Sequence, residues 1–419
     1  MQEKFSRFAH RFVGQTGTRL LMDDLGDVLS QPEAFDNLGG GNPAAIPGMQ
    51  ALFRSALETA LKDGSFDRLS GAYDGPQGHR PLLEAVALLM RSRYGWPVGP
   101  ENVAMTAGSQ SSFLMLFNLL AGLCADGIRR HILLPLTPEY IGYADLAVEP
   151  GAIRSFRPRI EELGEREFKY RVDFDRFRLT PEVGAVCVSR PTNPTGNVLS
   201  AAEMSTLARI TADAGVPFII DNAYGVPFPG IVFDDVEPLF GENVIYCLSL
   251  SKLGLPGLRT GIVIARAEII EALTSMNAIF TLASGSLGAS LVSPLIASGR
   301  VLDLVQSVLR PYYEARVRKA IGWCDTYFDG LNYRRHRSEG AIFLWLWFPG
   351  LPIDAQELYR RLKERRVLVI PGHYFFPGLE DDWSHRHECI RISYAQSPEQ
   401  VERGIRTIAE EVRRAFAAA

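Results

Sequence analysis

The chain has 419 residues, of which 47% are hydrophobic and 22% charged, and its 44 Lys and Arg residues stand against 48 Asp and Glu residues. This composition excludes a disordered chain and a disulfide-stapled miniprotein, and the length allows two or three domains. The net charge of −4 shows no basic excess, which argues against a nucleic-acid partner and favours small molecules.

Short apolar runs bounded by turn residues recur between residues 100 and 265. They lie at Val103–Ala107, Ile132–Leu136, Ala185–Ser189, Pro217–Ile220, Val244–Leu248 and Gly261–Ala265. Such continuous runs are typical of strands buried on both faces of a sheet. A capping-box string, Ser200-Ala-Ala-Glu203, opens a predicted helix that ends near Gly215. The pattern predicts an α/β fold, with helices on both faces of a mostly parallel central sheet.

The pattern changes after residue 300, where a smaller α+β domain is predicted. Its elements are a long helix over Val301–Tyr327 with a break at Pro311, a strand over 341–348, a helix over about 354–366, a strand over Val367–Ile370 and a helix over about 397–417. We therefore expect three parts. These are an N-terminal segment (1–48) packed on the small domain, a large domain (49–300) that carries the candidate site, and a small C-terminal domain (301–419).

The sequence indicates a cytoplasmic protein without a membrane partner. Its five cysteines include no CxxC pair, which fits reduced thiols better than a disulfide framework. The first residues lack the apolar core of a signal peptide. The apolar run Ala341–Phe348 is too short to span a bilayer. The uncharged stretch 272–299 is rich in hydroxyl and amide residues, so we interpret it as a buried segment or a subunit interface.

Two predicted strands are followed at once by residues suited to chemistry. Lys252 lies in the string Ser249-Leu-Ser-Lys252, and a lysine amine becomes a nucleophile where its surroundings lower its pKa. Asp221, with Tyr224 three residues on, follows another strand, where a buried carboxylate needs a partner. Ligands bind at the carboxyl ends of strands in open α/β sheets. Taken singly, Lys252 could equally be a surface lysine and Asp221 a helix cap.

Two further turns follow predicted strands. The string Arg190-Pro-Thr-Asn193-Pro-Thr-Gly196 predicts a rigid turn that presents the Asn193 amide. The string Gly108-Ser109-Gln110 precedes a predicted helix, whose N-terminus suits a phosphate, and Arg259 adds a cation. The chain has no P-loop string and no G-x-G-x-x-G after a predicted strand, which argues against a nucleotide site.

In this order, the four motifs and the distant Arg391 resemble the fold-type I pyridoxal-phosphate aminotransferases of class I/II. Longer strings resemble one subfamily, the bacterial valine–pyruvate aminotransferases. These strings are residues 73–78, 138–143, 189–197, 221–230, 249–257, 339–348 and 371–378. The resemblance covers the chain from about Leu20 to Glu410. It departs from the family pattern at Ala72, where Asn is expected, and at Ala283-Ser284-Gly285, where Ala-Pro-Gly is expected.

The resemblance implies roles for these residues. Lys252 is expected to hold pyridoxal 5′-phosphate and to move a proton, Asp221 to keep the ring nitrogen protonated, and Tyr224 to hydrogen-bond the phenolic oxygen. The other expected cofactor contacts are Tyr140 stacked on the ring, Asn193, a phosphate group formed by Gly108, Ser109, Gln110, Ser249 and Arg259, and Tyr73 from the partner subunit of a homodimer. The substrate carboxylate is expected at Gly41, Asn193 and Arg391.

The resemblance also implies a reaction. An amino group moves between L-valine, or another small aliphatic amino acid, and pyruvate, giving 3-methyl-2-oxobutanoate and L-alanine. In aspartate aminotransferases the region that corresponds to residues 272–299 supplies an arginine from the neighbouring subunit to an acidic side chain. Here these residues support an aliphatic preference, because they offer the apolar Ile279, Phe280 and Leu282 but no Lys, Arg or His. The alternatives are an aromatic or aminoadipate aminotransferase, a pyridoxal-phosphate β-elimination lyase, and the effector-binding domain of a regulator.

One rival pattern indicates a metal. His385, His387 and Cys389 alternate, and they would share one face of an extended segment. Zinc is usually held by four ligands, and a fourth ligand at the usual spacing is missing. We therefore expect no metal site.

Overall fold

A central sheet and a smaller second sheet organise this computed structural model, which describes residues 4–13, 16–19, 22–23, 26 and 35–418. The strand order of the central sheet is β2-β11-β10-β9-β8-β4-β3, with β5 beside β4. The strands are β2 (Val103–Thr106), β3 (Gly122–Leu123), β4 (Arg129–Leu134), β5 (Ile153–Ser155), β8 (Val183–Ser189), β9 (Phe218–Asn222), β10 (Val244–Ser249) and β11 (Gly261–Ile264). Strands β10, β9, β8, β4 and β5 are parallel, whereas β11 is antiparallel to both neighbours. The predicted mostly parallel sheet is confirmed.

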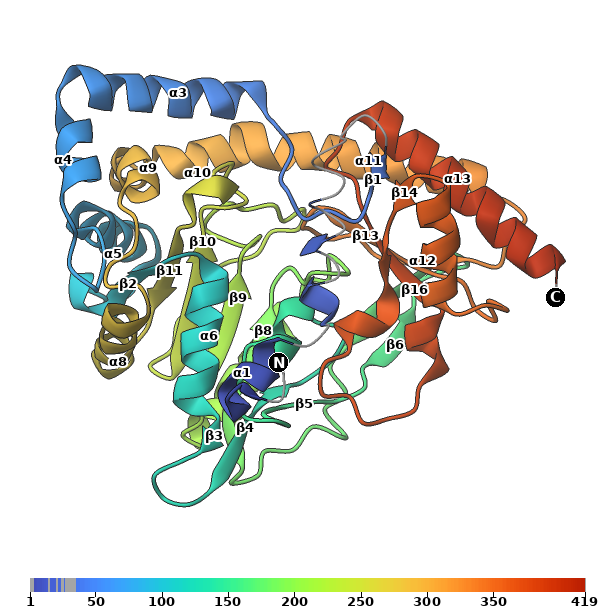
Figure 1. Ribbon diagram of the computed structural model, residues 1–419, viewed down its shortest axis with the longest axis horizontal. Helices are drawn as coiled ribbons and strands as arrows, with labels where there is room; N and C mark the ends of the chain where they lie inside the picture. The colour runs from blue at the N-terminus through green and yellow to red at the C-terminus, as the bar shows by residue number, and fades with distance from the viewer. Residues whose placement is uncertain (1–3, 14–15, 20–21, 24–25, 27–34, 419) are drawn as a thin grey trace.

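The central strands are apolar because both of their faces are covered. All seven residues of β8 are buried, and alternate residues enter two different clusters. Ala185 and Cys187 pack with α6 (Ser109–Leu120) and α8 (Ala267–Phe280). Val186 and Val188 belong to the larger cluster on the other face. Figure 1 shows α6 lying across one face of the sheet.

The remaining helices of this part are α3 (Pro47–Lys62), α4 (Ser65–Gly71), α5 (Arg80–Tyr94), α7 (Ala201–Asp213) and α9 (Leu287–Ala297). The predicted capping box of α7 is present. Ser200 Oγ accepts a hydrogen bond from Glu203 N, and Ser200 N donates to the Glu203 carboxylate at 2.9 Å. Short 3₁₀ turns lie at Pro100–Asn102, Ile141–Asp145, Pro256–Leu258, Gly372–Phe375 and Ser384–His387.

The second sheet joins strands from two distant parts of the chain. Its order is β15-β16-β13-β12-β7-β6. The strands are β6 (Arg159–Glu162), β7 (Glu167–Arg171), β12 (Arg334–His336), β13 (Phe343–Trp347), β15 (Ile370–Pro371) and β16 (Cys389–Ser393). In Figure 1 the green β6 lies among the orange and red C-terminal elements. We keep the division at residue 300 as a proposal, with β6 and β7 as an excursion of the large domain into the second sheet.

The long helix predicted after residue 300 is continuous but irregular. It consists of α10 (Arg300–Leu304), a π-helical turn (Val305–Leu309) and α11 (Arg310–Tyr327). Pro311 comes just after the π-helical turn, and because it has no N–H it cannot donate to a carbonyl oxygen of that turn, so the predicted break is an irregularity within one helix. The last two helices are α12 (Ala355–Glu364) and α13 (Pro398–Ala417).

The described part of the N-terminal segment contacts C-terminal elements. Strand β1 (Asp36–Asn37) pairs in parallel with β14 (Val367–Leu368). Asp36 also forms an ion pair with Arg403 of α13 at 2.6 Å. A short helix, α1 (Arg7–Phe12), comes earlier in the expected segment 1–48. Part of residues 1–34 lies outside the described residues. Of the described helices, none alone has the length and apolar composition to cross a membrane; only α9 with Arg300–Tyr327, bent by 93°, meets that test as a pair.

Candidate active site

Three neighbouring strands deliver the candidate residues to one edge of the central sheet. Asp221 lies on β9, where it pairs in register with Ser189 of β8 and Cys247 of β10. Asn193 follows β8, and Lys252 follows β10. The edge therefore holds the Asp221 carboxylate, the Lys252 amine and the Asn193 amide, as the sequence predicted from the ends of parallel strands.

The Lys252 amine is half-buried and makes one hydrogen bond. Its Nζ donates to the carbonyl oxygen of Gly41 at 2.5 Å, and it lies 5.4 Å from the centre of the Tyr224 ring. Desolvation, followed by the positive charges of Arg391 and Arg259, lowers the pKa of Lys252 from 10.5 to about 8. A large fraction of the amine is therefore neutral in mildly alkaline solution, as a nucleophile requires.

The Asp221 carboxylate is buried, with both oxygens occupied. Oδ2 accepts a hydrogen bond from the Tyr143 hydroxyl at 2.7 Å, and Oδ1 accepts one from Ala223 N at 2.9 Å. Burial raises the pKa of Asp221 to about 6, although both hydrogen bonds oppose the shift. Sequence reasoning missed Tyr143. It ends the string Pro138–Tyr143, from which only Tyr140 was selected.

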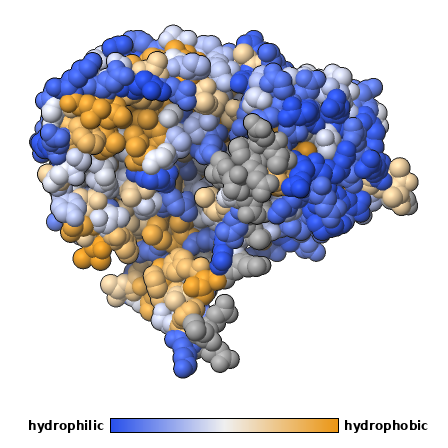
Figure 2. Space-filling model, turned by 45° about the horizontal axis from the view of Figure 1, so that its top comes forward, coloured by the Kyte–Doolittle hydropathy of each residue, from blue (hydrophilic) through white to orange (hydrophobic). Residues whose placement is uncertain are grey.

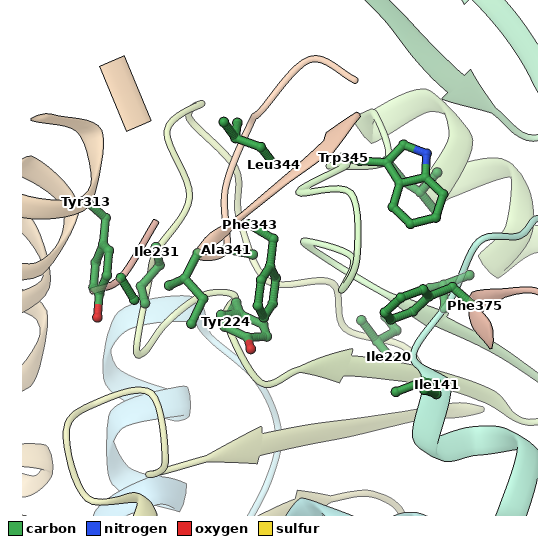
Figure 3. Close-up of a cluster of buried hydrophobic side chains, with 14 of the residues drawn as sticks. Ile141, Ile220, Tyr224, Ile231, Tyr313, Ala341, Phe343, Leu344, Trp345 and Phe375 are labelled. Atoms are coloured by element: carbon green, nitrogen blue, oxygen red, sulfur yellow. The ribbon is translucent and has the colours of Figure 1, made fainter. Parts of the chain in front are cut away.

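Two predicted tyrosines, Tyr224 and Tyr140, lie near these groups. The ring of Tyr224 is buried edge-to-face against Phe343 of β13, 5.8 Å between centroids, and Figure 3 shows the two rings side by side. Burial raises the pKa of the Tyr224 hydroxyl well above its ordinary value, so the hydroxyl remains a donor. The Tyr140 hydroxyl donates to Gln110 Oε1 at 3.2 Å, which places Tyr140 beside the start of α6.

The start of α6 forms a cradle with Arg259. Gly108 has a φ of +94°, a conformation that favours glycine, and a Cβ there would lie 2.3 Å from Nη2 of Arg259, so a larger residue would displace the guanidinium. No side chain of the described residues caps α6, whose first residues are Ser109 and Gln110. Ser249, the last residue of β10, is buried, and its Oγ accepts from Ser251 N. A helix N-terminus beside a cation suits a phosphate.

Arg391 is a buried cation with an unused donor. Nη1 donates to Asn193 Oδ1 at 2.8 Å, and Nη2 donates to the Gly39 carbonyl oxygen. Nε has no hydrogen-bond partner among the described residues, although it is buried. The guanidinium carbon lies 4.1 Å from the centre of the Phe343 ring, and burial lowers the pKa of Arg391 to about 10. At Gly41, no heavy atom lies within 4 Å of an added Cβ, so there is open space on that side of its Cα.

A buried ion pair supports the loop that carries Asn193. Lys169 Nζ donates to both carboxylate oxygens of Glu339 and to the Val198 carbonyl oxygen at 2.9 Å. Val198 N donates to Glu339 Oε2, also at 2.9 Å. Neither Lys169 nor Glu339 was predicted, because no local pattern marks two residues that lie 170 positions apart.

Four predicted residues stand apart from this group. The side chain of Tyr73 is 83% exposed. Ile279, Phe280 and Leu282 are exposed by 83%, 57% and 59%. The expectation that these three face the active site of the neighbouring subunit stays a prediction, and their position at the surface end of α8 leaves them accessible to a second copy of the chain.

The rival metal pattern is not extended. Residues Ser384–His387 form a 3₁₀ turn, so His385, His387 and Cys389 do not alternate along one strand. The buried His385 instead contacts the Tyr170 hydroxyl and, at 3.6 Å, the Cys389 thiol. No group of three or more His, Cys, Asp and Glu side chains in the described part of the chain could hold a metal ion.

Known proteins are similar to this chain in sequence and in architecture. The family described as aminotransferase class I and II matches residues 37–408. The chain is 48% identical to the valine–pyruvate aminotransferase of Escherichia coli (strain K12), over 99% of both chains. The structure of a valine-pyruvate aminotransferase from Salmonella typhimurium matches with a TM-score of 0.88 and 47% identity, over 96% of this chain and 100% of that one. An alpha-aminoadipate aminotransferase from Thermus thermophilus, complexed with N-(5′-phosphopyridoxyl)-L-leucine, shares the fold, with a TM-score of 0.78 and 22% identity over 100% and 99% of the chains.

Proposed function

The chain belongs to the class I and II aminotransferase family, and we propose that it moves an amino group between L-valine, or another small aliphatic amino acid, and pyruvate. The products are 3-methyl-2-oxobutanoate and L-alanine. The enzyme is an aminotransferase that uses pyridoxal 5′-phosphate. The similarity to the Escherichia coli valine–pyruvate aminotransferase extends over the full length of both chains. It supports transamination rather than β-elimination or a regulatory role.

The residues at the sheet edge fit this cofactor. Asp221 is a buried carboxylate that forms no ion pair with a described cationic side chain, so a protonated ring nitrogen would supply the missing partner. The cradle of Gly108 and Arg259 at the start of α6 suits the phosphate. We propose that Ser109, Gln110 and Ser249 complete the phosphate group.

The bound cofactor withdraws electrons from the substrate Cα and carries the amino group between the two half-reactions. Lys252 would hold the cofactor through Nζ, and its lowered pKa would let it take a proton from the substrate Cα. Asp221, ionised and held by Tyr143, would keep the ring nitrogen protonated. The Tyr224 hydroxyl would donate a hydrogen bond to the phenolic oxygen, and Asn193 and Tyr140 would complete the contacts to the ring.

The substrate carboxylate is assigned to Arg391. A guanidinium with a buried, unpaired Nε–H gains a hydrogen bond when a carboxylate enters, and bidentate pairs of this kind are strong. Asn193 and Gly41, beside Arg391 and Lys252, line the same space. With its carboxylate on Arg391, the substrate would present its α-carbon to the amine of Lys252.

The observation that supports an aliphatic substrate is a cavity beside Lys252. Its volume is about 170 Å³. Among the described residues that line it there is no Asp, Glu, Arg or His, and Lys252 is the only charged one. The apolar lining residues include Ala44, Ile46, Met49, Leu253, Leu309 and Tyr313, and Gln50 is a polar one. A side-chain carboxylate in this cavity would lack a dedicated partner and be costly to bury.

We also propose a homodimer in a reducing, cytoplasmic compartment. Tyr73 and the exposed apolar end of α8 (Ile279, Phe280 and Leu282) favour a covering surface, which a second copy of the chain would supply. Figure 2 shows that hydrophobic residues gather in separate areas of the face it presents.

All five cysteines are free, which supports the reducing compartment.

The test is a panel of amino donors with pyruvate as acceptor, in which alanine formation is measured. We expect kcat/KM for valine to exceed that for aspartate, glutamate and phenylalanine. Alanine and 2-aminobutyrate should overlap with valine, because one methylene changes binding by only ~1–3 kcal/mol. If aspartate or phenylalanine exceeds valine by about tenfold, or ~1.4 kcal/mol, the aliphatic assignment is wrong.

A further inference from the structure

The carboxylate of Asp74 joins two segments that are far apart in the sequence. Its Oδ2 accepts hydrogen bonds from His79 Nδ1 at 2.8 Å and from Ser286 Oγ. A carboxylate is only an acceptor, so His79 carries its proton on Nδ1. Both donors are buried, whereas the Asp74 side chain is 20% exposed. Burial acts to raise the pKa of Asp74, but the hydrogen bonds from Ser286 and His79 outweigh it and hold that pKa below its ordinary value.

The loop 73–79 is fastened at other points as well. The buried Asn277 of α8 donates from Nδ2 to the Pro76 carbonyl oxygen at 2.7 Å. Gln77 donates to the carbonyl oxygens of Pro100 and Val103 at 2.8 and 2.9 Å. These bonds tie the loop to α8 and β2, and they do not involve Asp74. The fold of the loop therefore does not depend on the carboxylate alone.

Asp74 lies between two exposed groups of side chains. Its neighbour in the chain is Tyr73, whose side chain is 83% exposed. Its partner Ser286 immediately precedes α9 and follows the exposed Ile279, Phe280 and Leu282. One carboxylate thus joins the backbone beside Tyr73 to the segment that carries these apolar side chains. Both are the segments proposed to face a second copy of the chain.

We infer that Asp74 is the residue that positions Tyr73 of one subunit for the cofactor phosphate in the other. The inference rests on the proposed homodimer and on the proposed role of Tyr73. Asp74 acts through Tyr73 and contacts neither substrate nor cofactor itself. Without the hydrogen bonds of Asp74, Tyr73 samples more conformations in the free protein. Ordering Tyr73 on cofactor binding then costs more conformational entropy, which lowers the affinity for the cofactor.

The test measures the dissociation constant of pyridoxal 5′-phosphate from the full-length protein, by titrating the cofactor-free form. We expect Asp74→Asn to raise it about tenfold, or about 1.4 kcal/mol. Ser286→Ala, which keeps the carboxylate, should raise it less but in the same direction. The control is Asp67→Asn on α4, which makes the same chemical change at an exposed side chain and should leave the dissociation constant unchanged.

A double-mutant cycle separates positioning from general stability. In a Tyr73→Phe background, Asp74→Asn should change the dissociation constant by less than about twofold, because the group that it positions is gone. An equal effect in both backgrounds would show a merely structural role and overturn the inference. So would an unchanged dissociation constant for Asp74→Asn, or for Tyr73→Phe alone. The donor panel judges the proposed transamination separately, since it depends on substrate selectivity and not on cofactor affinity.

Discussion

The Tyr143 hydroxyl donates a 2.7 Å hydrogen bond to Oδ2 of Asp221, across 78 positions of sequence. The ring of Tyr143 is fully buried, with Tyr140 at 5.4 Å in an edge-to-face contact. A rigid donor therefore fixes the orientation of the carboxylate that is proposed to face the ring nitrogen. The electronic state of the cofactor then depends on a residue that does not contact the substrate.

Tyr143→Phe is the direct test of this relationship. Loss of a hydrogen bond to a charged group costs about 1.5–3 kcal/mol, so we expect kcat/KM for valine to fall at least about tenfold. Tyr246→Phe is the matched control, because that buried hydroxyl donates to the Val226 carbonyl at 2.6 Å and not to Asp221. Equal losses in the two variants would remove the special role of Tyr143.

Asp221→Asn should abolish nearly all transamination and yet stabilise the cofactor-free protein. Burial raises the pKa of Asp221 from 3.8 to about 6, so its contribution to stability is full below the unfolded pKa and is lost as pH rises through about 6. We expect the variant to unfold at a higher urea concentration than the parent at about pH 8, with the difference shrinking towards about pH 4. Asp234→Asn, at an exposed position, is the control. A difference that grows on acidification would contradict the prediction.

The reactivity of Lys252 should follow its lowered pKa. We expect covalent attachment of the cofactor to the cofactor-free protein to speed up with pH and to level off above about 8, because the neutral amine reacts. An ordinary lysine would continue to gain reactivity to about pH 10. Borohydride reduction and mass spectrometry should place the pyridoxyl group on Lys252. A label on another lysine, or none, would refute the assignment.

The cavity beside Lys252 predicts a change in selectivity when it is filled. Ala44→Leu should lower kcat/KM for valine more than for alanine, because the larger substrate side chain needs the space; we expect the ratio to fall about tenfold. Ala51→Leu places the same side chain on the exposed face of α3 and should leave the ratio unchanged. An unchanged ratio for Ala44→Leu would move the side-chain pocket elsewhere.

The exposed end of α8 predicts where a dimer would be sensitive to charge. Phe280→Glu should shift the protein towards monomers in light scattering, because it buries a carboxylate in the proposed interface. Leu123→Glu replaces another exposed apolar residue, on β3 of the central sheet, and should leave the mass unchanged. A dimer that persists at equal concentrations in both variants would place the interface on another surface.

The central sheet could be predicted because burial on both faces leaves a local signature. Each of its six predicted strands is present, for example β8 over Val183–Ser189 for the predicted Ala185–Ser189. Strands β6 and β7 have no such signature, since Arg159–Arg171 mixes charged and apolar residues and pairs with a strand near residue 335. That pairing depends on contacts between distant parts of the chain, which no local pattern encodes.

The candidate site divides in the same way. Asp221 lies near the end of β9, and Asn193 and Lys252 come soon after β8 and β10, so their convergence at one edge could be predicted. The residues that hold them, such as Tyr143 on Asp221, come from other elements and could not. The cavity beside Lys252 could not be predicted for a related reason. Its lining comes from residues near 44 and 309, which only the folded chain brings to Lys252.

The bond between Arg391 and Asn193 crosses from the second sheet to the loop that follows β8 of the central sheet. A substrate carboxylate that takes the free Nε–H of Arg391 would leave the bond from Nη1 to Asn193 in place. Substrate binding and the tie between the second sheet and this loop would then stabilise each other. The Lys169–Glu339 pair holds the same loop, so we expect it to affect substrate affinity without touching the substrate.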